Sequence, residues 1–229
     1  MTDKTREPQY QAAVDIADVY GVSRLGLMAN QVWHDDPRRL AILLARYKFV
    51  AKMLSGAADV MEVGCADAFG TRIVQQEVGH VTAIDFDPLF IADVEARRTP
   101  AWPLTTGVHD MLSGPFPGET PGRFDGVYSL DVVEHIDRKD EDVFVGNLAG
   151  SLNDEGTLII GSPSLASQAY ASPASKEGHI NCKTAENLKA LLKAHFANVF
   201  VFSMNDEVVH TGFYQMAHYY FVLCCGPKR

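Results

Sequence analysis

The feature that most constrains this chain is the alternation, along its middle, of short β-rich runs with stretches of helical character. Each run is followed by a turn, and the turn by residues typical of a helix. Strands that alternate with helices in this way predict a parallel sheet with helices on both faces. The five runs are Asp59–Val63, His80–Ile84, Leu104–Val108, Phe124–Ser129 and Thr157–Ile160.

Two further β-rich runs, Val199–Met204 and His218–Cys225, close the sequence. The loop between them is too short for a crossover helix, which predicts an antiparallel pair at one edge of the sheet. We therefore expect an α/β protein with three layers. Its seven-stranded sheet is mostly parallel and has an antiparallel last strand.

The residues before the first strand carry helix signals only. Asp36-Pro37 supplies an N-cap and a proline at the first helical position, so a long helix is predicted to begin there. Tyr10–Tyr20 predicts an earlier helix that ends at a glycine. Val22–His34 is then expected to be a connection between the two helices.

Composition places the chain among ordinary globular proteins. It has 229 residues, 47% hydrophobic and 21% charged, with no linker-like stretch, so one domain over residues 1–229 is expected. A net charge of −9 argues against a nucleic-acid partner. The opening residues are unlike a signal peptide, and the longest apolar run, Tyr219–Cys225, is too short to cross a bilayer. We expect a cytoplasmic protein that acts on a small molecule and has no membrane partner. Its oligomeric state is left open.

The first strand ends in a turn rich in small residues. Gly64, Ala66 and Gly70 let the backbone turn tightly and pass close to a ligand before a helix begins. The second strand ends at Asp85, about twenty residues later, where a carboxylate can accept hydrogen bonds from both hydroxyls of a ribose. Together these features predict a cofactor that contains adenosine.

The spacing within the turn separates two classes of cofactor. A dinucleotide requires G-x-G-x-x-G, so that a pyrophosphate rests on the helix N-terminus. Here Phe69 occupies the third position, and Glu62 would repel a pyrophosphate while suiting a cationic amino group. The pattern E-x-G-x-A-x-x-x-G instead resembles motif I of the class I S-adenosylmethionine-dependent methyltransferases. That family usually has glycine where this chain has Ala66.

The resemblance extends over roughly residues 40 to 225. Ile84-Asp-Phe-Asp-Pro88 resembles motif II, and Phe124–Ile136 resembles motif IV with its following helix. The family implies a Rossmann-like fold and S-adenosyl-L-methionine as cofactor, with Asp85 on the ribose, Phe86 against the adenine, and an acidic side chain and a backbone N–H near the adenine after the third strand. The cofactor-binding residues implied are Glu62, Gly64, Ala66, Gly70, Asp85, Phe86, Asp110, Met111 and Asp131.

Methyl transfer to an alcohol requires a positioned acceptor and removal of its proton. Glu134 and His135 follow the fourth strand, and His179 and Tyr170 lie in the long loop after the fifth. We expect His179 to be the acceptor-side base, with His135 in reserve. Tyr170 is a third candidate, because the length of the loop that carries it favours a binding or lid role. In the alternative, His135 packs against a helix or contacts the cofactor, and Glu134 hydrogen-bonds to nearby backbone.

A divalent metal is a further alternative for these residues. Asp131-x-x-Glu134-His135 with a later His179 is similar to the metal set of small-RNA 3′-end 2′-O-methyltransferases. It is also similar to the Glu-x-x-Glu-His of ubiquinone-pathway O-methyltransferases. The first residue here is Asp, which shortens its reach.

The predicted function is methyl transfer from S-adenosyl-L-methionine to a hydroxyl, or less favourably an amine, of a small metabolite or sugar. An NAD-dependent oxidoreductase and a non-catalytic cofactor-binding domain are the alternatives. Similar methyltransferases often fold an N-terminal segment over the cofactor, so residues 1–35 are expected to be a lid on a core of residues 36–229. Trp33 in that segment is either part of the lid or a core anchor.

Overall fold

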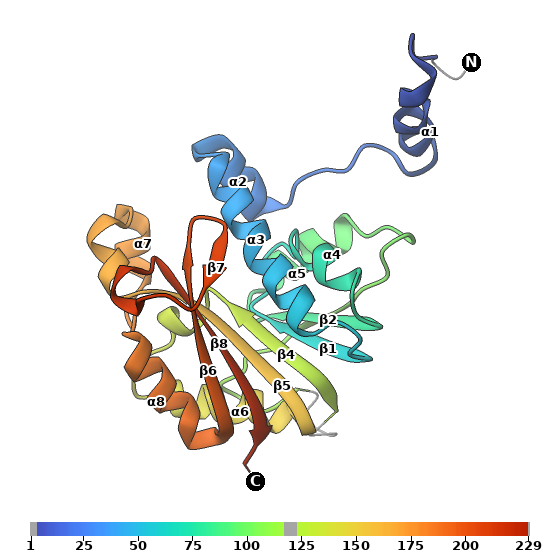
Figure 1. Cartoon of the computed structure of the whole chain (residues 1–229). Helices are drawn as coiled ribbons and strands as arrows, with labels where there is room; N and C mark the ends of the chain where they lie inside the picture. The colour runs from blue at the N-terminus through green and yellow to red at the C-terminus, as the bar shows by residue number, and fades with distance from the viewer. Residues whose placement is uncertain (1–3, 117–122, 229) are drawn as a thin grey trace.

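One mixed sheet organises the described residues, 4–116 and 123–228, of the computed structural model (Figure 1). The strand order is β3-β2-β1-β4-β5-β8-β6-β7. Strands β1 to β5 pair in parallel, β8 is antiparallel to β5 and β6, and β7 is antiparallel to β6. The strands are β1 (Asp59–Val63), β2 (His80–Asp85), β3 (Thr105–Val108), β4 (Phe124–Leu130), β5 (Leu152–Pro163), β6 (Phe196–Asn205), β7 (Val208–His210) and β8 (Tyr219–Pro227).

The predicted α/β class and the antiparallel strand near the end of the chain are confirmed, but the sheet has eight strands rather than seven. The additional strand is β7, which forms a hairpin with the end of β6 across Asp206 and Glu207. Its three residues are too few to show a period of two, so the sequence pattern did not reveal it.

Helices cover both faces of the sheet, as predicted. Buried side chains of α3, α4 and α5 form one hydrophobic core with β1 and β2, and those of α6 and α8 form a second with β4 and β5. The chain therefore has three layers. The helices are α3 (Arg38–Met53), α4 (Thr71–Gln75), α5 (Pro88–Ala96), α6 (Glu141–Ser151), α7 (Pro173–Gly178) and α8 (Ala185–His195), with single turns η2 (Val133–His135), η3 (Ala166–Tyr170) and η4 (Tyr214–Met216).

The expected connection Val22–His34 is wrong in part, because it contains helix α2 (Leu27–Asp35). Carboxylates of the core cap its first turn: Leu27 N donates to Asp93 Oδ2 at 3.2 Å, and Ala29 N donates to Asp67 Oδ2 at 2.7 Å. Both partners are distant in sequence, so local signals did not indicate the helix.

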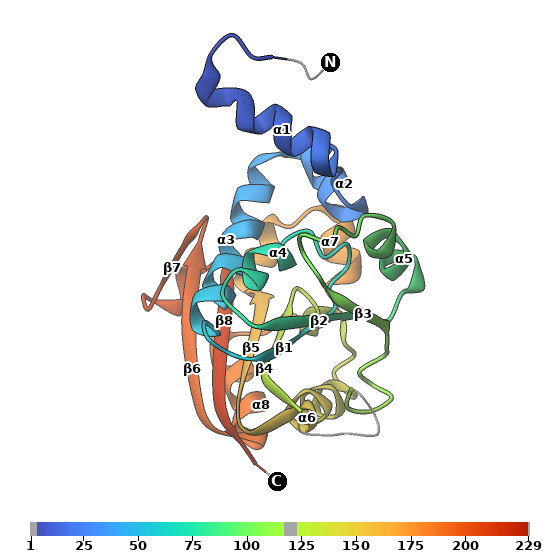
Figure 2. The ribbon, with the colours of Figure 1, turned by 90° about the vertical axis from the view of Figure 1, so that its right-hand side faces the viewer.

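The first helix stands away from the rest of the molecule (Figures 1 and 2). Helix α1 (Gln11–Tyr20), preceded by the turn η1 (Pro8–Tyr10), buries none of its residues. Trp33 on α2 is 53% exposed, so it is not a core anchor. Among the described residues, no helix is both long and apolar enough to span a membrane.

Candidate functional site

The turn after β1 brings the backbone against the loop after β4. Gly64 has φ +75°, and a Cβ there would lie 2.2 Å from Val132 Cγ2. Only glycine fits this approach. A Cβ on Gly70 would instead lie 2.3 Å from the Tyr47 ring, so Gly70 serves the packing of α3 on the turn. Ala66 adopts φ 44°, a conformation that is costly for a residue with a Cβ.

Asp85 ties this turn to the loop after β2. Its Oδ2 accepts from Ala66 N at 2.9 Å and its Oδ1 from Asp87 N at 2.9 Å. Each carboxylate oxygen keeps a further lone pair for a ligand. The adjacent Phe86 ring is 73% exposed at the carboxyl end of β2. An acceptor for hydroxyls thus lies next to an open aromatic face.

The residues after β3 differ in what they can offer a ligand. Asp110 is exposed, and its Oδ1 accepts from Leu112 N at 2.9 Å. Met111 is 3% exposed, its side chain belongs to the core, and its carbonyl accepts from Asn147 Nδ2 at 2.6 Å. The contact of its N–H with the adenine, which the sequence resemblance implied, stays a prediction.

Glu62 is buried within a set of hydroxyl donors. Its carboxylate accepts from Tyr47 and Tyr128, each at 2.8 Å, and from Thr71. Burial raises the pKa of Glu62 to about 7, although the three hydrogen bonds act in the opposite direction. Through Glu62 these hydroxyls join α3 and α4 to β1 and β4, and the role of Glu62 toward a cationic amino group of the cofactor stays a prediction.

Asp131, directly after β4, is held by a residue that sequence reasoning missed. Arg46 Nη1 on α3 lies 2.7 Å from both carboxylate oxygens of Asp131, and its guanidinium lies 3.8 Å from the centroid of the Tyr219 ring. Asp131 has φ 57°, so the backbone turns sharply here. An arginine 85 residues earlier in the chain gives no local signal of this pair.

Glu134, His135 and His179 meet at the same edge of the sheet. Each offers one ligand atom, and these atoms lie within 4.8 Å of one another. The Asp131 carboxylate, predicted as the fourth member of this set, is paired with Arg46 instead. The structure thus brings together three of the four predicted residues.

Glu134 is fully buried among the described residues. Its Oε2 accepts from Ser162 Oγ at 3.2 Å, and its Oε1 has no hydrogen-bond partner in the part of the chain that is described. Burial and the nearby Asp131 raise the pKa of Glu134 to about 8. An unpartnered buried oxygen is costly and indicates a place for a donor or a cation.

Both histidines of the cluster have a defined tautomer. His135 Nδ1 lies 2.8 Å from Gly178 O, and His179 Nδ1 lies 2.9 Å from Gln168 Oε1. Because both partners accept, each Nδ1 carries the proton and each Nε2 keeps a free lone pair. The Gln168 side chain presents its Oε1 to His179 because its Nε2 donates to Ser164 O and Ser167 Oγ.

The environment of His179 keeps its ring neutral. Burial and the adjacent His135 lower the pKa of His179 below 6.5. The ring centroids of the two histidines are 5.0 Å apart. Tyr170 is 92% exposed, and none of its described contacts involves either histidine, so the structure does not bring it to the cluster.

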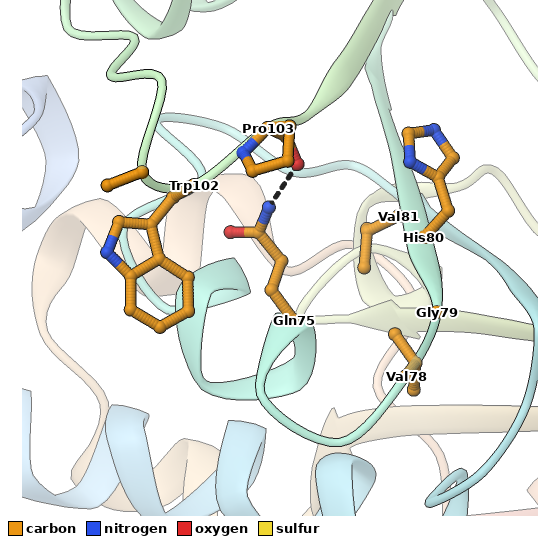
Figure 3. A pocket seen from close by; sticks show the side chains of 8 residues that line it. Gln75, Val78, Gly79, His80, Val81, Trp102 and Pro103 are labelled. Atoms are coloured by element: carbon orange, nitrogen blue, oxygen red, sulfur yellow. Dashed lines mark hydrogen bonds between the residues drawn. The ribbon is translucent and has the colours of Figure 1, made fainter.

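A small cavity lies at the opposite end of the strands (Figure 3). It has about 160 Å³ and is lined by residues such as Trp102, His80 and Gln75, whose Nε2 donates to Pro103 O at 2.6 Å. Sites for drug-sized ligands measure roughly 300 to 1,000 Å³. This cavity is therefore too small for a nucleoside and too far from the carboxyl ends of the strands to be part of the site.

Part of the sequence matches a known protein family. Residues 61–160 match the family described as "Methyltransferase domain". Over 107 residues, 47% of this chain, the sequence is 27% identical to a "Probable S-adenosylmethionine-dependent methyltransferase" of Mycobacterium tuberculosis. The match covers 36% of that protein, so the chain spans about a third of the length of the curated relatives it matches.

Solved structures show the same fold. The N-methyltransferase NodS of Bradyrhizobium japonicum, in complex with S-adenosyl-L-homocysteine, superimposes with a TM-score of 0.60 at 19% identity, over 86% of this chain and 91% of NodS. The methyltransferase domain of bacterial CtHen1-C gives a TM-score of 0.65 at 13% identity, over 81% of this chain and 99% of that domain. At these identities the likeness concerns the fold alone.

Proposed function

The chain belongs to the class I S-adenosylmethionine-dependent methyltransferases, and we propose that it moves a methyl group to a hydroxyl of a small metabolite or sugar. The observation that carries the choice of a hydroxyl is the neutral His179, whose free Nε2 lies at the carboxyl edge of the sheet. An alcohol must lose a proton during transfer, and a neutral imidazole accepts one near pH 7.

The residues at the carboxyl ends of the parallel strands fit S-adenosyl-L-methionine. The free lone pairs of Asp85 suit the ribose hydroxyls, the exposed Phe86 ring suits the adenine, and Gly64 lets the turn pass close to Val132. When bound, the cofactor supplies an electrophilic methyl group on a sulfonium. We assign the adenine-binding part of the site to the Asp110 carboxylate and the backbone N–H of Met111.

The protein then has two tasks, orientation and proton removal. The Gly64 turn touches Val132, and the same loop continues into η2 with His135. His179 Nε2 accepts the hydroxyl proton, while Gln168 Oε1 holds Nδ1–H and stabilises the imidazolium that forms. His135 is the second base if His179 is lost.

The test is methyl transfer itself. Metabolite fractions are incubated with enzyme and methyl-labelled cofactor, and mass spectrometry searches for products heavier by one methyl group in place of a hydrogen. Equilibrium binding of S-adenosyl-L-methionine against NAD separates the proposal from an oxidoreductase. Tight binding without any transfer would favour a non-catalytic cofactor-binding domain.

A divalent cation is the second candidate for the cluster. One ring nitrogen of each imidazole and one carboxylate oxygen of Glu134 lie within 4.8 Å of one another, and hydrogen bonds fix both imidazoles. A bound cation would hold the acceptor oxygen and make its hydroxyl more acidic. Titration with Mn²⁺ or Zn²⁺ in a calorimeter should then show one site that is lost in Glu134→Gln. Full activity after chelation would leave His179 as a base alone.

We also propose that residues 1–35 form a lid. Helix α2 is capped by Asp67 in the cofactor turn and by Asp93 on α5, so its position depends on the loops that would surround the cofactor. Helix α1 exposes apolar side chains, among them Ile16 and Val19, that could cover a bound ligand.

A further inference from the structure

The loop that carries His179 is bound to η2 on both sides of that histidine. On one side, Gly178 O accepts from His135 Nδ1 at 2.8 Å. On the other side, Asn181 N donates to Glu134 O at 2.9 Å. Glu134 and His135 are the two members of the cluster that η2 supplies. The spacing within the cluster therefore depends on how this loop rests on η2.

The side chain of Asn181 joins the loop to two further parts of the chain. Its Nδ2 donates to Ile136 O, directly after η2, at 3.0 Å and to Glu141 Oε2, at the start of α6, at 2.8 Å. Its Oδ1 accepts from Lys183 Nζ at 2.7 Å. Both protons of the amide and one lone pair of its oxygen are thus used. Aspartate, the side chain closest in shape, has no donor for either of the first two bonds.

Lys183 supports this network from the interior. It is 9% exposed and forms an ion pair with Glu141, whose side chain is 18% exposed. Its main chain also meets the end of β5, because Leu165 N donates to Lys183 O at 2.9 Å. Removing one partner of a buried ion pair is strongly destabilising. Lys183 and Glu141 therefore form a rigid support to which the Asn181 amide is bonded.

We propose that Asn181 is a positioning residue, which sets the distance between His179 and His135 by holding the loop on η2. The inference rests on the proposed role of His179 as the acceptor-side base. The two ring centroids are 5.0 Å apart, and each ring is hydrogen-bonded to another part of the described chain and not to the other ring. The backbone that carries the rings thus sets their spacing. A misplacement of about 1 Å can lower a rate roughly 10²-fold.

Replacing Asn181 by alanine removes its three side-chain hydrogen bonds and leaves the backbone bond to Glu134. Turnover is measured with methyl-labelled cofactor and a metabolite fraction that yields labelled product. We expect kcat to fall at least tenfold, while calorimetry shows wild-type affinity for S-adenosyl-L-methionine. Asn153→Ala is the matched control, because Asn153 Nδ2 donates to Asp125 Oδ1 at 2.7 Å near the opposite end of β5. This control should keep wild-type turnover.

A general loss of stability would also lower turnover, so the effect must be traced to His179. The variants Asn181→Ala, His179→Ala and their combination form a double-mutant cycle. If Asn181 acts by placing His179, adding Asn181→Ala to His179→Ala should lower kcat less than threefold further. An equal loss in both backgrounds overturns the proposal. So does wild-type turnover in Asn181→Ala, or a tenfold loss in Asn153→Ala.

The placement can also be measured in the full chain without any acceptor. Long-range proton–nitrogen NMR spectra report which nitrogen of each neutral imidazole carries the proton. In Asn181→Ala, His135 should become a mixture of tautomers as Gly178 O moves away, whereas His179 keeps its bond to Gln168 Oε1.

Unchanged spectra overturn the positioning role, whatever the acceptor is. If the spectra change as expected but the wild type methylates no fraction, the proposed function is wrong and the placement of the histidines by Asn181 stands. Asn181→Ser is the second variant if the alanine variant does not fold. Its hydroxyl is too short to reach Ile136 O and Glu141 together, so the same changes are expected.

Discussion

Replacing Glu62 by glutamine should remove much of the pH dependence of stability. Burial raises the pKa of Glu62 from 4.5 to about 7 in the folded chain. The folded state therefore binds the proton more tightly than the unfolded state. The resulting stabilisation is complete below pH 4.5 and is lost as the pH rises to about 7. Glutamine resembles the neutral acid and has no such proton to lose.

The size of the effect follows from the two pKa values. Their difference corresponds to about 3 kcal/mol, of which about 2.5 kcal/mol falls between pH 5 and pH 8. Urea unfolding at these two pH values measures it. The free energy of unfolding of the wild type should fall by that much more than that of Glu62→Gln.

The exposed Glu155 provides a matched control, since Glu155→Gln makes the same chemical change outside the core. This variant should keep the wild-type pH dependence. Glu134, also buried, has the same effect in both the wild type and Glu62→Gln, so it cancels in the comparison. Equal pH dependence in wild type and Glu62→Gln would refute the assignment of a neutral, hydroxyl-bound carboxyl at Glu62.

The remaining predictions concern the cofactor site, the base and the lid. Asp85→Ala should weaken binding of S-adenosyl-L-methionine at least tenfold in calorimetry, because each hydrogen bond to a carboxylate contributes roughly 1.5–3 kcal/mol; unchanged affinity would remove the ribose assignment. Gly64→Val should abolish that binding, since even a Cβ would lie 2.2 Å from Val132 Cγ2, and retained binding would contradict the role of the turn. His179→Ala should lower turnover by roughly 10²–10⁴ at constant cofactor affinity. Wild-type turnover should rise with pH through a pKa below 6.5, because the neutral ring is the base; a flat profile would exclude it. Deleting residues 1–21 removes no side chain described as buried, so the melting temperature should hold while the cofactor dissociates faster in stopped-flow measurements; an unchanged rate would argue against the lid.

Features that depend on local pattern could be predicted from the sequence. The strands, the turn at Gly64 and the acid at Asp85 each have a signal within a few residues, since periodicity and turn chemistry act over short distances. The convergence of Glu134, His135 and His179 also followed from topology, because they come after neighbouring parallel strands.

Features set by distant contacts could not be predicted. Arg46 reaches Asp131 only once α3 packs on the sheet, and the cap of α2 comes from Asp67 and Asp93. Tyr170 shares a loop with His179, yet it points to solvent because loop membership alone does not determine a side chain's direction.

The cap of α2 also has a consequence for the order of events during synthesis. Residues 27–35 leave the ribosome well before Asp67 and Asp93, the two side chains that satisfy the first amides of the helix. Both capping carboxylates are present only once residue 93 has emerged. The capped form of α2 therefore becomes available only after the β1–α5 unit has been synthesised, and until then water satisfies these amides.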